Sequence, residues 1–215
     1  MSSLLQSIVQ AASSTSISPF PAPNSGSFNT NRGSSFGSVG TPYDPGGGIV
    51  TVGSMWDGLQ RKTYNGVWSN NGGNDNPSLF NGSPDEIIYS DVYVSFGSQS
   101  ASAIDYAMEW KGYIQAPGNN AYYNFYLESD DYAMVWIGDA ALDPDNNTPL
   151  ITTNNAGALN TNSIQMTSGL YYPIRLRFQE RSGGEYCQLY MSVEGGTLLS
   201  MNNWYTANNH EFGYN

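Results

Sequence analysis

The second half of the chain contains strand-length segments in which every second residue is apolar. Between residues 170 and 180 the apolar positions are Ile174, Leu176 and Phe178, and the polar positions between them are Arg175, Arg177 and Gln179. Residues 185–193 repeat the alternation with Cys187, Leu189, Met191 and Val193. A period of two is that of a β-strand with one buried face. The intervening Ser182-Gly183-Gly184 predicts a hairpin that pairs these two strands.

Similar segments at residues 87–96, 104–116, 121–128 and 132–138 are separated by turn-forming residues such as those at 117–120. No long segment has the period of a helix. The chain is rich in Tyr, Gly and Asn, and only 12% of its residues are charged. These features predict an all-β fold over residues 51–215, an antiparallel β-sandwich or barrel of about ten strands.

Residues 1–50 have a different composition. Only Arg32 and Asp44 are charged, and Ser, Gly and Pro supply 24 of the 50 positions. Such a segment cannot bury enough apolar surface to order itself, so we expect an extended N-terminal arm that other protein subunits order by contact. The first ten residues lack the positive start and long apolar core of a signal peptide, so we expect no cleaved signal.

The charge balance narrows the possible partners. Seven basic and 18 acidic residues give a net charge of −11. This argues against nucleic acid and against anionic membrane surfaces, which both need a basic footprint. No stretch reaches the ~20 apolar residues that a membrane span needs. Cations and neutral sugars remain compatible partners.

The chain has one cysteine and one histidine. Cys187 lies on an apolar strand face and is expected to be a buried hydrophobic residue. His210 has no second His or other Cys to complete a zinc site. With one Cys and one His no nucleophilic catalytic set is credible, and we predict no enzymatic activity. A glycosidase pair of carboxylates is the alternative that the many acidic residues leave open.

Asp130 and Asp131 follow one apolar segment and precede another. Adjacent carboxylates repel each other unless water or a hard cation such as calcium offsets the charge. A solvated hairpin turn is the alternative interpretation. A second acidic group, at Asp139, Asp143 and Asp145, lacks the Gly and closing Glu of a twelve-residue calcium loop, and is interpreted as a solvated loop.

From about residue 55 to 205 the sequence resembles the domain family named for the anthrax protective antigen, and most closely its yeast flocculin and adhesin branch. The resemblance rests on short motifs in matching order, which are Gly58-Leu59 before Tyr64, Trp110-Lys111-Gly112-Tyr113-Ile114, Pro117-Gly118 before Tyr122-Tyr123-Asn124-Phe125, Ser129-Asp130-Asp131 before Val135-Trp136-Ile137-Gly138, Gly169-Leu170-Tyr171-Tyr172-Pro173-Ile174-Arg175, and Gly183-Gly184.

The resemblance implies a calcium site in which Asp130 and Asp131 are ligands across a cis peptide bond. Because calcium takes 6 to 8 oxygens, it also implies ligands from a late loop, for which Asn202 and Asn203 are the candidates. The chain departs from the family pattern at Tyr132, where Gly is common, in having a single cysteine, and in the expected lack of a signal peptide.

Aromatic and basic residues supply the remaining candidates. Trp110 and Trp136 are expected in the core, and Arg175, Arg177 and Arg181 are expected to pair with Glu180 and Glu185 on a solvated sheet face. Candidate glycan contacts are Trp204, Tyr132 and Trp68.

Two functions remain open. The first is a structural component of a virion or filament, docked through residues 1–50 and displaying a β domain able to bind glycans through calcium. The alternative is a stand-alone, calcium-dependent carbohydrate-binding adhesin module. Both place the protein on the surface of a virion or an extracellular assembly.

Overall fold

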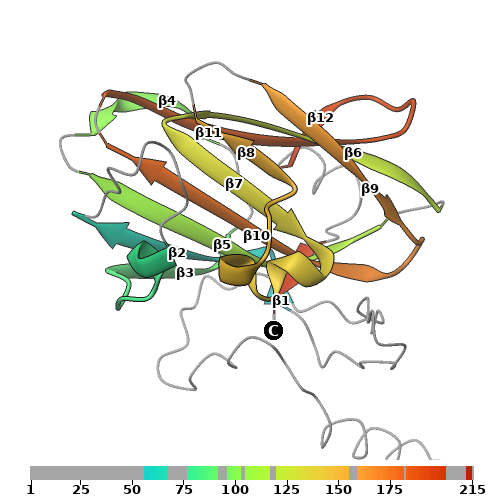
Figure 1. Ribbon diagram of the computed structural model, residues 1–215, viewed down its shortest axis with the longest axis horizontal. Coiled ribbons are helices and arrows are strands. Elements are labelled where there is room, and N and C mark those ends of the chain that lie inside the picture. Colours follow the sequence, from blue (N-terminus) through green and yellow to red (C-terminus); the bar gives the residue numbers. More distant parts are fainter. Residues whose placement is uncertain are drawn as a thin grey trace, which may run out of the picture.

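The computed structural model describes residues 56–66, 77–91, 96–102, 105–116, 120–154, 159–181, 183–201 and 212–214. Within them the chain forms two antiparallel sheets, seen one above the other in Figure 1. The predicted all-β sandwich is confirmed. The proposed arm, residues 1–50, lies outside the described residues.

The larger sheet, called sheet A here, contains eight described strands in the order β1-β13-β5-β10-β7-β8, with β2 and β3 continuing from β5. Its strands are β1 (Trp56–Asp57), β2 (Leu59–Asn65), β3 (Glu86–Asp91), β5 (Tyr106–Gln115), β7 (Tyr132–Ile137), β8 (Ile151–Thr153), β10 (Tyr171–Glu180) and β13 (Phe212–Tyr214).

The smaller sheet, called sheet B here, contains five described strands in the order β12-β11-β6-β9, with β4 also pairing with β11. Its strands are β4 (Phe96–Ser102), β6 (Ala121–Asp130), β9 (Asn160–Met166), β11 (Gly183–Val193) and β12 (Leu199–Ser200).

The core lies between the two sheets and follows the alternation seen in the sequence. Sheet A contributes Trp110, Ile174, Leu176 and Phe178, all fully buried. Sheet B contributes Tyr123, Phe125, Leu127, Cys187, Leu189 and Met191, also fully buried. Burial of these side chains is the main favourable term in folding.

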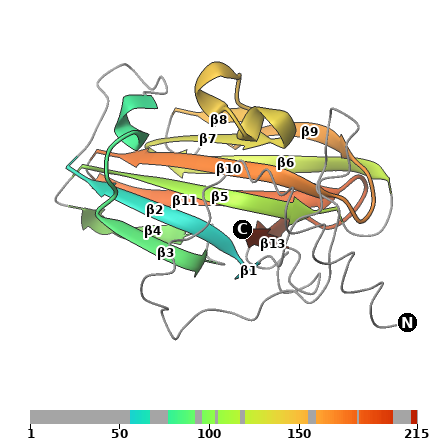
Figure 2. The ribbon, with the colours of Figure 1, turned by 90° about the horizontal axis from the view of Figure 1, so that it is seen from below.

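Three single-turn 3-10 helices cover the outer face of sheet A. They are η1 (Pro77–Phe80), η2 (Gly138–Ala141) and η3 (Pro144–Asn146). η1 contacts β5, and η2 contacts β7 and β10. Figure 2 shows η2 and η3 as gold turns beside β7 and β8. None of the helices in the described part of the chain is long and apolar enough to cross a bilayer.

The predicted hairpin around residues 182–184 is wrong. β10 belongs to sheet A and β11 to sheet B, and β11 pairs with β6 instead. The connection β6–β7 also changes sheet. Local turn residues cannot distinguish a hairpin from such a crossing, because both need the same sharp reversal. Both crossings lie at the same end of the sandwich and build the candidate site there.

Candidate functional site

The two aspartates lie where the chain passes from one sheet to the other. Asp130 is the last residue of β6, Tyr132 is the first residue of β7, and Asp131 is the only residue between the strands. The Asp130–Asp131 peptide bond is cis, as the resemblance implied. The interpretation as a hairpin turn is wrong because β6 and β7 lie in different sheets.

Neighbouring backbone and hydroxyl groups hold the aspartates in place. The backbone N–H of Arg181 donates a hydrogen bond to Asp131 Oδ2, with an N–O distance of 3.0 Å. On the other side the buried hydroxyls of Ser129 and Thr153 share a hydrogen bond. The Ser129 Oγ also lies 3.2 Å from the Asp131 carbonyl oxygen. The pair is therefore fixed to β8 and to the end of β10.

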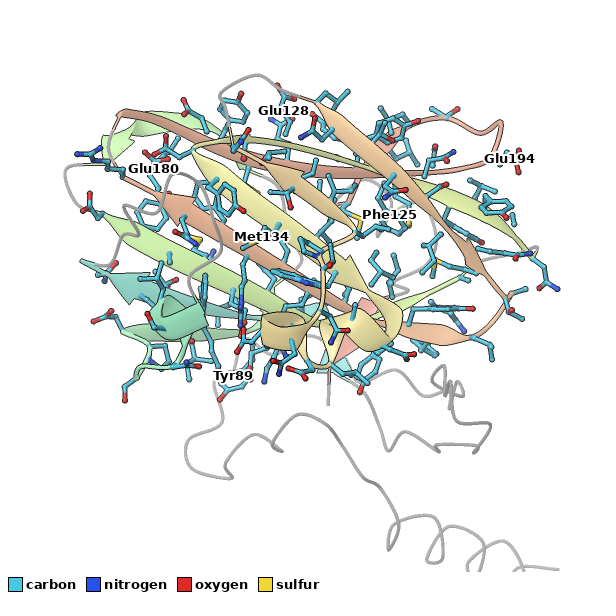
Figure 3. All side chains as sticks on the ribbon, viewed as in Figure 1. Tyr89, Phe125, Glu128, Met134, Glu180 and Glu194 are labelled. Carbon is cyan, nitrogen blue, oxygen red and sulfur yellow. The ribbon has the colours of Figure 1, made fainter. Side chains whose placement is uncertain are left out.

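A third carboxyl, that of Glu180, is buried beside the pair. Glu180 is the last residue of β10, is 0% exposed, and neither of its oxygens makes a hydrogen bond of good geometry. Burial, and then the charges of Asp131 and Asp130, raise the pKa of Glu180 to about 8, and the nearby Asp131 backbone offsets only part of this rise. Figure 3 shows Glu180 at the same end of the sandwich as the start of β7.

Glu185 is the fourth acidic side chain at this end. Its Oε2 accepts a hydrogen bond from the Tyr106 hydroxyl at 2.9 Å. Burial, followed by this hydrogen bond, raises the pKa of Tyr106 well above its usual range. The charge of Glu185 also adds to the rise in the Glu180 pKa. Negative charge is thus concentrated at one end of the sandwich.

This concentration fits a hard cation. Burial and then the Asp131 charge raise the pKa of Asp130, so its ionised form is disfavoured in the metal-free protein. A divalent ion would lower the cost of ionising Asp130 and the buried Glu180. However, in the described part of the chain no group of three or more His, Cys, Asp or Glu residues is arranged to hold a metal. The aspartates would therefore need oxygen ligands from elsewhere.

Several predicted site residues fall on parts of the chain that the structure does not describe. These are Asn202, Asn203, Trp204 and Trp68. Tyr132 is described and does not face outward. It is 5% exposed and packs in a small cluster with Met134, Trp136 and Ala141. Its ring is therefore covered by protein, which corrects its assignment as a glycan contact.

The expected ion pairs of the arginines are also corrected. Arg177 Nε and Arg175 Nη1 bind the buried Glu109 Oε2 at 2.9 Å and 3.1 Å, rather than Glu180 or Glu185. Arg177 Nη1 also binds Asp145 Oδ1 at 2.6 Å. Asp145 therefore forms an ion pair, whereas the sequence predicted only a solvated loop. Arg177 faces away from the core between the sheets, but Phe80 of η1 and Asp145 of η3 contact it there.

The alternation contained a signal for Glu180 that the sequence interpretation missed. Glu180 is the next residue in the inward series Ile174, Leu176 and Phe178, so period two alone places it inside. The expected pairing with arginines on a solvated face is wrong for Glu180, although Glu is rarely fully buried. The expectations for Cys187, Trp110 and Trp136 are confirmed, since each is 0% exposed.

Residues 106–195, which are 90 of the 215 residues, match the model of the GLEYA domain family. No curated protein matches the chain.

Solved structures share the fold at low sequence identity. The Epithelial Adhesin 6 A domain from Candida glabrata, in complex with Galβ1-3GlcNAc, has a TM-score of 0.59 and 15% identity, over 82% of this chain and 92% of that domain. The Epithelial Adhesin 9 A domain from the same organism, in complex with Galβ1-4GlcNAc, gives 0.54 and 14%, over 76% and 91%. The PA14 domain of the antifreeze protein MpAFP gives 0.53 and 20%, over 70% and 90%.

Together these matches support the yeast adhesin part of the resemblance, in sequence over residues 106–195 and in fold over most of the described chain. They do not show a relation to the anthrax protective antigen itself. The chain is thus similar to GLEYA and adhesin domains in the region that contains the aspartate pair.

Proposed function

We propose that residues 51–215 form a non-enzymatic, calcium-dependent glycan-binding module of the adhesin type, presented outside a cell. The observation that carries the proposal is the position of Asp130 and Asp131, fixed together at the corner where β6 of sheet B passes into β7 of sheet A. A cation at this corner would also stabilise the ionised form of the buried Glu180 carboxyl behind them.

The chemistry of the site suits this role. Calcium supplies an electrophilic centre that sugar hydroxyls can ligate alongside protein oxygens. Asp130 and Asp131 would provide two carboxylates, with Asn202 or Asn203 and backbone carbonyls as further ligands. Arg181 N and Ser129 orient the aspartates before anything binds, which lowers the entropy cost of binding. Trp204 and Trp68 remain proposed stacking contacts for the sugar ring.

The other interpretation, a component of a virion or filament docked by residues 1–50, receives no support from the comparisons. Two of the solved structures that share the fold are adhesin domains in complex with galactosyl disaccharides. These comparisons favour the adhesin interpretation, and with it a glycan as the partner of the β domain.

Calorimetric titration of the full chain tests the proposal. Calcium should bind the wild type, and Asp130→Asn should weaken it by about tenfold or more because one carboxylate ligand is lost. Glu194→Gln is the matched control, since Glu194 is exposed at the opposite end of the sandwich (Figure 3). Galβ1-3GlcNAc and Galβ1-4GlcNAc are then titrated with calcium and with EDTA. Absence of calcium uptake by the wild type would refute the proposal.

A further inference from the structure

The outer face of sheet B carries a row of tyrosines that leads to Asp130. Outward residues of β6 include Tyr122, Asn124 and Tyr126, and outward residues of β11 include Tyr186, Gln188 and Tyr190, because the inward positions between them are buried core residues. In contrast to sheet A, no helix of the described residues lies over this face in Figures 1 and 2.

The register of the strands sets the spacing of the row. Tyr190 is directly opposite Tyr126, and Tyr186 is directly opposite Asp130. Tyr122 and Tyr126 are four residues apart, which is about 13 Å along a strand, and Asp130 lies about the same distance further on. The row is therefore continuous with the aspartate site and extends about 27 Å from it.

The chemistry of the face selects an uncharged partner. Tyrosine rings offer flat apolar surface with a polar tip, and the amides of Asn124 and Gln188 add donors and acceptors. Tyr122 is 49% exposed, and the Tyr190 hydroxyl donates a hydrogen bond to Gln188. The outward positions of β6 and β11 hold no Lys or Arg, and only Glu128 and Asp130 are acidic. An anionic polymer would find no basic footprint there.

We infer that this face binds an extended, uncharged polysaccharide chain, with successive sugars stacked along the tyrosine row away from Asp130. Neutral chains of sugar rings match a surface of aromatic rings, amides and hydroxyls that has no basic residue on β6 or β11 and is acidic only at Glu128 and Asp130. The inference extends the proposed function from a terminal disaccharide at the aspartates to a longer glycan along sheet B.

The test is native affinity electrophoresis of the full chain in gels that contain a neutral galactan, a mannan or laminarin. At least one polysaccharide should retard the wild type. Tyr122→Ala, and separately Tyr126→Ala/Tyr190→Ala, should weaken this retardation by about tenfold, because aromatic anchors carry much of the energy of an interface. Tyr89→Ala is the matched control, since Tyr89 lies on β3, on the opposite side of the molecule from Glu128 (Figure 3).

The outcomes separate this inference from the proposed function. Disaccharide binding should survive Tyr122→Ala, since Tyr122 is far from Asp130, and should be lost in Asp130→Asn. If the tyrosine variants migrate like wild type, or if no polysaccharide retards the wild type, the inference is overturned even where Asp130→Asn behaves as proposed. Ultracentrifugation that shows a dimer dissolved by Tyr122→Ala would assign the face to a second copy of the chain and also overturn it.

Discussion

The backbone N–H of Arg181 and the carboxylate of Asp131 join the two sheet crossings with a hydrogen bond of 3.0 Å. This contact gives Asp131 a structural role that can be separated from metal binding. Asp131→Asn keeps an acceptor oxygen for Arg181, whereas Asp131→Ala removes it. We expect Asp131→Ala to lower the free energy of unfolding by about 1–2 kcal/mol more than Asp131→Asn, measured by urea denaturation in EDTA. Equal losses would show that the contact does not stabilise the fold.

Calcium titration of the same two variants gives the complementary result. Both should bind calcium more weakly than wild type because each lacks one carboxylate ligand. The variants should therefore differ in stability and agree in calcium affinity. A wild-type affinity in Asp131→Asn would restrict the role of Asp131 to the contact with Arg181.

Glu180 predicts a pH-dependent stability of the metal-free protein. Its pKa is about 8 in the folded protein, because of burial and then the charges of Asp131 and Asp130, against an ordinary value of 4.5. The folded state therefore keeps a proton that the unfolded state has already lost. The contribution of Glu180 to the free energy of unfolding is fully present below the ordinary pKa of 4.5. It is lost as the pH rises through about 8.

Glu180→Gln should remove this dependence. Its free energy of unfolding relative to wild type should increase as the pH rises between the two pKa values, since glutamine cannot ionise. Urea denaturation in EDTA across this interval measures the difference. Glu194→Gln, at the exposed opposite end, should show no such trend (Figure 3). A constant difference between Glu180→Gln and wild type would contradict the assignment.

The sequence contained enough information for the sandwich but not for the way its strands connect. The alternation in residues 170–180 and 185–193 correctly identified the inward faces that hold Phe178 and Leu189. It could not show that β11 pairs with β6, because pairing partners are distant in sequence and period two carries no information about them. For the same reason the alternation could not show that the chain changes sheet at Asp131.

The errors at the site have a common physical cause. The alternation of Arg177 with core residues predicts a solvated face, but η1 and η3 fold over that face. Coverage of a sheet by loops depends on tertiary packing rather than on strand period. Glu180 is the opposite case, since strand period placed it inside and the usual exposure of Glu argued against it.

The buried ion pairs of Arg177 predict a large loss of stability when one partner is removed. Arg177 is 3% exposed, binds Glu109 and Asp145, and lies with its guanidinium 4.4 Å from the centre of the Phe80 ring. Arg177→Met would leave Glu109 buried with less neutralising charge, so we expect a loss of about 3–5 kcal/mol in urea denaturation.

The surface pair Arg61–Glu86 is the control for Arg177. It has a similar geometry, 3.2 Å between Nη2 and Oε2, but the Glu86 side chain is 55% exposed. Glu86→Gln should cost no more than about 1 kcal/mol. A similar loss in both variants would mean that burial does not determine the strength of the Arg177 network.

Cys187 provides a chemical probe of global unfolding. Its side chain is fully buried in the core between the sheets, and burial raises the pKa of its thiol well above the usual range. The reactive thiolate is therefore absent from the folded protein. We expect Cys187 to react with a disulfide reagent only at the rate at which the domain opens, with urea increasing that rate in parallel with unfolding. Fast labelling in the absence of urea, while the circular dichroism stays native, would place Cys187 in a locally opening segment instead of the core.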